Sequence, residues 1–137
     1  MKTRQSAFTL LEIMLVVAII GVLLGAAIYK MSPALDVAKG TTSGGGIQAI
    51  RTMLMMYNSK TGYYPTTEQG LKALVVRPTT EPVPSSWVHL MDDVPKDPWG
   101  KEYIYRFPGT RNPNSYDLFS AGPDHKPDTA DDDWGSN

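Results

Sequence analysis

The chain has 137 residues, a formal net charge of −1 and no cysteine. This balance gives no reason to expect nucleic-acid binding, and the missing cysteines exclude disulfides and thiolate metal sites. An apolar N-terminal segment takes up about 30 residues, so about a hundred remain for one small domain. The 11 prolines and 12 glycines indicate that this domain is rich in loops.

The apolar segment runs from Phe8 to Tyr29, and Glu12 is its only charged residue. As a helix it would be roughly 33 Å long, which is enough to cross the hydrocarbon core of a bilayer. A carboxylate inside such a helix costs about 2.5–3.5 kcal/mol on insertion scales, so Glu12 is expected to have a role. Gly21 and Gly25 have the spacing that lets membrane helices approach closely, although glycine is common in membrane spans.

The N-terminal residues share some features with an ordinary secretory signal. A basic start, an apolar stretch and Gly25-Ala-Ala27 would suit such a signal, cut after Ala27. Two features oppose it: the apolar stretch exceeds the usual 7–15 residues, and Glu12 lies inside it.

The residues Ser6-Ala-Phe8-Thr-Leu-Leu-Glu12-Ile-Met resemble the class III leader of type IV pilins and of type II secretion pseudopilins. The resemblance implies that a prepilin peptidase removes residues 1–7, cutting between Ala7 and Phe8, and then methylates the new amine. Ala7 stands where the family nearly always has glycine, and a small residue is expected to fit. Residues 8–30 would then form the transmembrane helix and the filament core.

The same resemblance implies a role for Glu12 in assembly. A carboxylate in hydrocarbon needs a cation, and cleavage would free the α-amine of Phe8 on a neighbouring subunit. Two alternatives remain open. The amine and Glu12 of one chain lie about one turn apart and would allow an intramolecular pair, and a lone acid near the interface would reach water.

Two features are expected to interrupt the helix beyond the anchor. Pro33 lacks a backbone N–H, which predicts a bend or break near residues 31–33. The run Lys39-Gly-Thr-Thr-Ser-Gly-Gly-Gly46 contains four glycines, and each costs about 0.5–1 kcal/mol relative to alanine in a helix. It lacks the Lys-Ser/Thr of a phosphate loop, so we predict a flexible joint where related pseudopilins have a continuous helix.

The next segments give local signals of structure. Ile47, Ile50, Leu54 and Tyr57 recur at helical spacing and predict an apolar face that packs on a sheet. Thr66 and Gln69 form a predicted capping box for a short helix that ends near Val75. The surrounding phrase, Tyr64-Pro-Thr-Thr-Glu-Gln-Gly-Leu-Lys-Ala-Leu74, is similar to the major pseudopilins of type II secretion.

The C-terminal half predicts a hairpin. Asp97-Pro-Trp-Gly100 suits a turn, Lys101–Phe107 alternates like a strand with three aromatics on one face, and Ser115–Ser120 would be its partner. The turn and the phrase Asp117-Leu-Phe-Ser-Ala-Gly-Pro-Asp124 again resemble the family, so the likeness covers most of the chain. It implies a type IV pilin-like α+β fold: a long N-terminal helix, a small antiparallel sheet and a short extra helix, with residues 31–137 as the globular domain.

The last 21 residues are acidic. They contain Asp117, Asp124, Asp128, Asp131, Asp132 and Asp133. Carboxylates and carbonyls on a bent backbone suit calcium, but the spacing is not that of an EF-hand, and a solvated acidic terminus is the alternative on composition alone. The resemblance implies calcium binding by the side chains of Asp124, Asp131 and Asp132 and by backbone oxygens including that of Ala121. Asp128 stands where relatives usually have glycine, and would add a ligand or only charge.

The function implied by the resemblance is that of a major pseudopilin. Copies of the chain would polymerise into the periplasmic pseudopilus of a type II secretion system and drive export of folded proteins across the outer membrane. The expected partners are other copies, the prepilin peptidase, minor pseudopilins and inner-membrane platform proteins, with the subunit in the inner membrane and its globular domain in the periplasm. No enzyme is expected, because no nucleophile–base pair or nucleotide loop is found. The alternatives are a type IV pilin for adhesion or motility, and a secreted calcium-binding domain behind an ordinary signal peptide.

Overall fold

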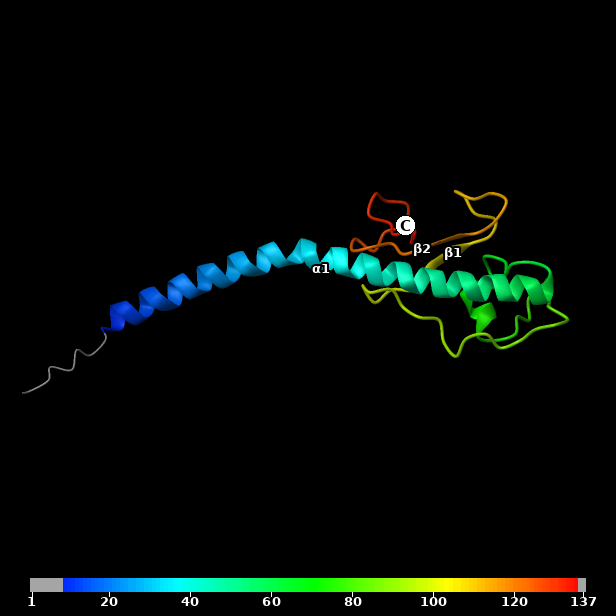
Figure 1. Cartoon of the computed structure of the whole chain (residues 1–137), viewed down its shortest axis with the longest axis horizontal. Helices are drawn as coiled ribbons and strands as arrows, with labels where there is room; N and C mark the ends of the chain where they lie inside the picture. Colours follow the sequence, from blue (N-terminus) through cyan, green and yellow to red (C-terminus); the bar gives the residue numbers. More distant parts are fainter. Residues whose placement is uncertain (1–8, 136–137) are drawn as a thin grey trace, which may run out of the picture. The chain divides into compact units, whose positions relative to one another are not determined.

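The computed structural model describes residues 9–135, and for residues 31–37 it describes the backbone alone. The elements in chain order are helix α1 (Leu10–Thr61), the short 3₁₀ helix η1 (Leu71–Leu74) and strands β1 (Ile104–Arg106) and β2 (Asp117–Phe119) (Figure 1). The chain separates into two compact units, Met1–Asp36 and Val37–Asn137, and α1 contributes to both.

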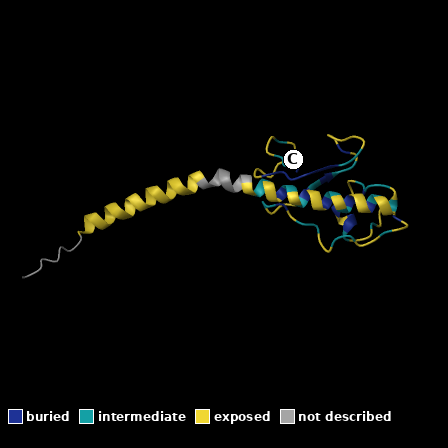
Figure 2. Ribbon diagram, viewed as in Figure 1, coloured by how far each residue is buried: buried dark blue, intermediate teal, exposed yellow. Residues whose placement is uncertain are grey.

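The N-terminal unit is an exposed apolar helix. The segment Leu10–Lys30 has 21 residues and is long and apolar enough to cross a membrane, judged by length and composition. Every residue from 9 to 30 is exposed (Figure 2). The helix begins with a side-chain cap, because the backbone N–H of Glu12 donates to Thr9 Oγ1 at 3.3 Å.

The break predicted near residues 31–33 and the interruption predicted at Lys39–Gly46 are wrong, since α1 is helical through both stretches; a bend near residues 31–33 stays a prediction. Pro33 removes only one hydrogen bond from a ladder that continues on both sides. Two of the four glycines lie near another segment: a Cβ on Gly44 would lie 3.8 Å from the Gly135 Cα, and Gly46 faces Tyr103, whereas Gly40 and Gly45 have nothing within 4 Å. A Cβ on Gly46 would collide with the ring of Tyr103, whose hydroxyl donates to the Ser43 carbonyl at 3.3 Å. Tertiary packing therefore offsets the low helix propensity of the run.

The core of the second unit forms on the predicted face of α1. Ile47, Ile50, Leu54 and Tyr57 are all at most 1% exposed, which confirms the helical periodicity. They pack against residues of η1, of the two strands and of the position before β1, namely Leu71, Ala73, Leu74, Tyr103, Tyr105 and Leu118. In Figure 2 this half of α1 alternates between buried and exposed positions, as expected of an amphipathic helix.

The sheet is a two-stranded antiparallel pair with Tyr105 opposite Leu118. Tyr103 and Tyr105 are buried and Phe107 is partly buried, so the three aromatics share the core face as predicted. The strands are shorter than predicted, because Glu102 and Ser120 at their outer ends pair with Lys96 and Asp133 and because the connection folds back on β2. There, the Asp117 carboxylate accepts the backbone N–H groups of residues 110, 111 and 112 at 2.7–3.0 Å.

Two predicted turn motifs are confirmed by their hydrogen bonds. Thr66 and Gln69 exchange the two 3.2 Å bonds of a capping box, but the box closes the turn before η1 and does not start the helix, whose N-cap is Gly70 without a side-chain hydrogen bond. In the Asp97–Gly100 turn, the Gly100 N–H donates to the Asp97 carbonyl at 2.9 Å. The buried Asp97 carboxylate also accepts the Ser120 hydroxyl, so this turn is tied to the end of β2.

Candidate functional site

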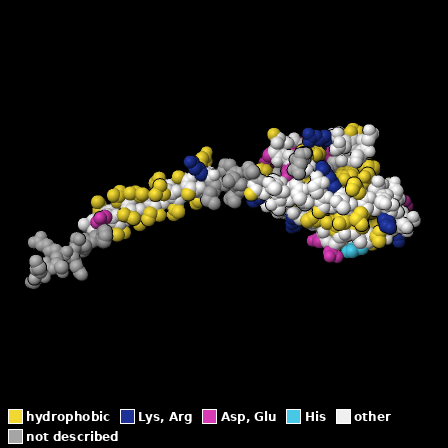
Figure 3. Space-filling model, viewed as in Figure 1, with side chains coloured by type: hydrophobic (Ala, Val, Ile, Leu, Met, Phe, Trp, Pro, Cys, Tyr) yellow, Lys and Arg dark blue, Asp and Glu magenta, His cyan; other side chains and the backbone are white. Residues whose placement is uncertain are grey.

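Glu12 is the only acidic residue of the apolar helical segment and lies in the first turn of α1. A carboxylate near a helix N-terminus is favoured by the helix dipole. Within the described part of the chain Glu12 has no salt bridge. Ala7 and Phe8, which form the predicted cleavage site, lie outside the described residues. Figure 3 shows the visible face of this segment covered by hydrophobic side chains.

The C-terminal loop leaves the domain after β2 and returns to the same point. Ser120 and Asp133 pair as an isolated antiparallel bridge, with two backbone hydrogen bonds of 2.9 Å. Ala121 and Gly122 at the start of the loop are buried, whereas residues 123–128 are exposed. A Cβ on Gly122 would collide with the Asp131 carbonyl, so glycine permits the two arms of the loop to meet.

The aspartates of the loop hold its backbone through hydrogen bonds. The Asp124 N–H donates to Asp131 Oδ2 at 3.2 Å, and the Thr129 hydroxyl donates to Asp131 Oδ1 at 2.8 Å. The Thr129 hydroxyl is the main cause that lowers the pKa of Asp131. Asp132 Oδ2 accepts the N–H groups of Asp128 at 2.8 Å and of Thr129 at 3.3 Å. These bonds give the loop a defined shape.

The predicted calcium ligands are partly brought together. Asp124 contacts the Asp131 carboxylate through its backbone N–H, while its own carboxylate accepts the Lys126 N–H at 2.8 Å, and Asp132 Oδ1 is buried with no hydrogen-bond partner. A buried carboxylate oxygen without a partner is costly, and a cation would satisfy it. The donors are all hard oxygens, which calcium prefers. In residues 9–135, however, no three acidic or histidine side chains converge closely enough to hold a metal ion as they stand.

Asp128 makes a contact that its sequence context did not predict. Its two carboxylate oxygens lie 2.9 Å from Nη1 and Nη2 of Arg106, which extends from β1. The hydrogen bonds from Arg106 hold the pKa of Asp128 below its ordinary value. A sequence signal existed: Arg106 stands between Tyr105 and Phe107, so it had to lie on the face of β1 away from the aromatics.

The chain after the loop is fixed to both β2 and α1. The Trp134 ring stacks on Phe119 with centroids 4.3 Å apart, and the Arg111 guanidinium lies 4.5 Å from the centroid of Trp134. Arg51 of α1 donates to the Trp134 carbonyl at 2.9 Å, and Gln48 donates to the Gly135 carbonyl at 3.3 Å. The loop is therefore closed by protein contacts at both ends.

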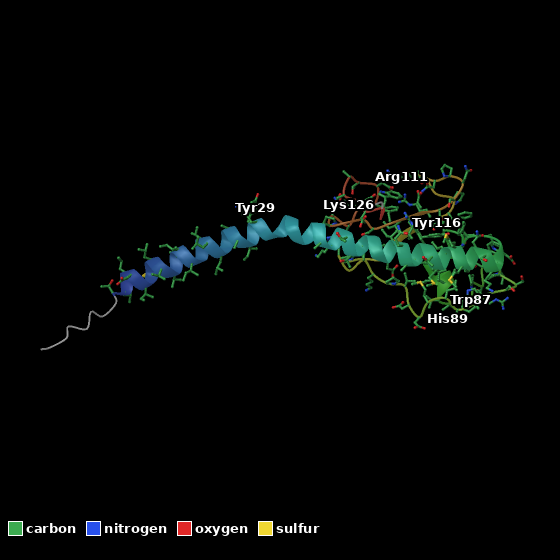
Figure 4. All side chains as sticks on the ribbon, in the orientation of Figure 1. Tyr29, Trp87, His89, Arg111, Tyr116 and Lys126 are labelled. Atoms are coloured by element: carbon green, nitrogen blue, oxygen red, sulfur yellow. The ribbon has the colours of Figure 1, made fainter. Side chains whose placement is uncertain are left out.

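The two histidines do not form a catalytic or metal site in the described residues. Both are exposed. His89 bonds to the Val75 carbonyl and to Asp92, and Figure 4 shows it beside Trp87 on the side of α1 away from Arg111 and Lys126. His125 lies in the C-terminal loop.

Comparison with known proteins gives matches over nearly the whole chain. Residues 2–28 match the model of the prokaryotic N-terminal methylation motif, and residues 30–135 match that of the type II secretion system protein G family. The chain is 42% identical over 134 residues to the type II secretion system core protein G of Pseudomonas aeruginosa, covering 96% of this chain and 93% of that protein. The protein of the same name from Escherichia coli K12 is 39% identical over 136 residues, covering 96% and 92%.

A solved structure is similar as well. The crystal structure of the major pseudopilin from the type 2 secretion system of enterohaemorrhagic Escherichia coli aligns with a TM-score of 0.68 and 38% identity. The alignment covers 74% of this chain and 85% of that one. The similarity therefore extends to the three-dimensional fold.

Proposed function

This chain belongs to the type II secretion system protein G family, and we propose that its copies polymerise into the periplasmic pseudopilus of such a system. Growth of this filament would drive the export of folded proteins across the outer membrane. One observation carries the proposal: a methylation motif at residues 2–28 is joined directly to the family's globular part at residues 30–135. The first feature implies a processed, membrane-anchored precursor, and the second identifies the secretion system.

The exposed apolar helix supports polymerisation. Large apolar side chains such as Leu15, Ile20 and Leu23 are 49–63% exposed in the single subunit. Such a surface is unstable in water and must be covered. We propose that inner-membrane lipid covers it before assembly and that helices of other copies cover it in the filament. The unit Val37–Asn137 would then lie in the periplasm.

Processing and assembly involve the residues at the start of this helix. We propose that a prepilin peptidase cuts between Ala7 and Phe8 and methylates the new amine, in keeping with the methylation-motif match. Glu12 would pair with that amine on the neighbouring copy. Minor pseudopilins and inner-membrane platform proteins are the further partners of the proposal. The type IV pilin alternative has less support, because the curated relatives described above are secretion-system proteins.

Replacement of Glu12 tests the assembly role. Glu12→Gln keeps the shape of the side chain and removes its charge. When it is produced with the prepilin peptidase and the secretion machinery, we expect normal cleavage but a loss of filaments under electron microscopy. Glu68→Gln, at an exposed acid of the globular unit, is the matched control and should assemble normally. Filaments of normal number and length from Glu12→Gln would reject the pairing.

We also propose that the C-terminal loop binds calcium. The side chains of Asp124, Asp131 and Asp132 and backbone oxygens including that of Ala121 would hold the ion. The buried, unpartnered Oδ1 of Asp132 and the all-oxygen donor set support this assignment. Calcium would supply positive charge to a loop of neighbouring carboxylates. Because the chain has no disulfide, metal binding to the folded state would add directly to its stability.

We propose no catalytic activity for the subunit. The family is a structural part of a secretion system. An open groove of about 630 Å³ lies along η1 and β1 and is lined by valines and by charged residues of both signs.

A further inference from the structure

The ion pair between Arg106 and Asp128 has no part in the roles described above. Both guanidinium contacts measure 2.9 Å, so the pair is bidentate, a geometry that adds specificity to charge attraction. It joins β1 to the exposed part of a loop whose two ends are already fixed by the bridge between Ser120 and Asp133. The ion pair therefore attaches the exposed part of the loop to β1, which the bridge between Ser120 and Asp133 does not do.

The backbone at Asp128 connects this ion pair to Asp132. Asp128 has φ 67°, in the left-handed region that favours glycine and that aspartate and asparagine tolerate best among other residues. In this conformation its carboxylate reaches Arg106, while its N–H donates to Asp132 Oδ2 at 2.8 Å. One residue thus links the cation on the strand to a carboxylate in the loop.

Arg106 is held more firmly than its partner. Its side chain is 27% exposed, against 60% for Asp128. Its guanidinium also lies 5.4 Å from the centroid of the Phe119 ring, which in turn stacks on Trp134. A planar guanidinium fixed on a ring presents its two N–H groups in a set direction. Arg106 is therefore a preformed anchor to which the loop attaches.

We propose that Arg106 and Asp128 form a latch that closes the C-terminal loop onto β1 without a metal, and that Asp128 positions Asp132 and is not a calcium ligand. Both oxygens of Asp128 are engaged by the guanidinium, which leaves its carboxylate satisfied, whereas Asp132 Oδ1 has no partner. The statement about calcium rests on the proposed function. The latch itself does not.

Hydrogen exchange in the presence of a chelator tests the latch. The full chain in detergent is compared with Arg106→Gln, Asp128→Asn and the double variant, because asparagine tolerates the positive φ and removes only the charge. We expect the N–H groups of Asp128 and Thr129 to exchange about two- to five-fold faster in each single variant. The double variant should be no faster than the singles, since one interaction is lost in all three.

Lys126→Gln is the matched control for charge. It removes a cation from the same loop, but in the described residues the Lys126 side chain forms no ion pair. In Lys126→Gln, the N–H groups of Asp128 and Thr129 should exchange at the same rate as in the unmodified chain. Unchanged exchange in Arg106→Gln, or additive effects in the double variant, would overturn the latch.

A second arm with saturating calcium tests the role of Asp128. We expect calcium to slow exchange in Asp128→Asn, as in the unmodified chain, and to have no effect in Asp132→Asn. If Asp128→Asn loses the calcium effect as fully as Asp132→Asn, then Asp128 is a ligand and that part of the proposal is wrong. If calcium has no effect even on the unmodified chain, the proposed calcium site fails, while the chelator arm still decides the latch.

Discussion

The ring of Tyr103 lies against the backbone of Gly46, so closely that a Cβ at this position would be 2.9 Å from the ring carbon Cζ. The Tyr103 hydroxyl donates to the Ser43 carbonyl one turn earlier. This contact brings the residues before β1 directly onto α1. It also gives a physical reason for glycine in the middle of a helix: the gain is close packing, not flexibility.

Alanine substitutions at the neighbouring glycines Gly45 and Gly46 should have opposite effects on the stability of the fold. Gly46→Ala forces Tyr103 to move and should lower the free energy of unfolding by about 1–3 kcal/mol. At Gly45 a Cβ meets nothing within 4 Å. Gly45→Ala should therefore raise the free energy of unfolding by about 0.5–1 kcal/mol, because alanine has the higher helix propensity. Thermal unfolding followed by circular dichroism, with the full chain in detergent, measures both. Equal stability of the two variants would contradict the packing role of Gly46.

The parts of the fold that sequence predicted are those set by local spacing. The buried face from Ile47 to Tyr57, the Thr66–Gln69 capping box, the turn at Asp97 and the aromatic face of β1 each depend on a few neighbouring residues. Their patterns have direct physical causes, namely helix and strand periodicity and side-chain capping. These elements were therefore predictable without knowledge of the rest of the chain.

The parts that sequence did not predict depend on distant residues. The helical run through Lys39–Gly46 looked unfavourable, because the cost of glycine is local while the compensating contact comes from Tyr103. The pair between Arg106 and Asp128 requires a positive φ at Asp128, which side-chain patterns do not reveal. In the C-terminal loop, sequence identified the acidic character but not which carboxylates cap backbone groups.

Alkaline pH should destabilise the globular unit. Burial raises the pKa of Tyr57, Tyr103, Tyr105 and Tyr116 above the ordinary value of 10.0. Above pH 10 the unfolded chain therefore loses protons that the folded chain keeps, so the contribution of these tyrosines to stability is constant below pH 10 and falls as pH rises further. Each tyrosine contributes a slope of up to about 1.4 kcal/mol per pH unit. Melting temperatures between pH 8 and pH 11.5 measure the fall.

Tyr105→Phe is the control for the alkaline effect. At neutral pH it should cost about 0.5–1.5 kcal/mol, because the hydroxyl donates a buried hydrogen bond of 2.7 Å to the Pro65 carbonyl. Above pH 10 its stability should fall less steeply than that of the unmodified chain, since one titrating group is gone. Parallel curves for the two proteins would show that Tyr105 does not contribute to the pH dependence.

Removal of calcium should lower the melting temperature of the full chain in detergent. At a free calcium concentration about 100 times the dissociation constant, the ion would add about 2.7 kcal/mol to the folded state, and a chelator would remove it. Asp132→Asn should unfold at the same temperature with and without chelator. Asp93→Asn, at an exposed acid outside the loop, should respond like the unmodified chain. No response to chelator in the unmodified chain would reject the calcium site.

The central claim is that this chain is processed as a pseudopilin precursor and anchored as a filament subunit. Mass spectrometry of the mature N-terminus, on protein isolated from cells that contain the prepilin peptidase, tests it most directly. We expect a mature chain that begins at Phe8 and carries one methyl group on its α-amine. A mature chain that begins at Ile28, as expected after cleavage of an ordinary signal peptide, would contradict it.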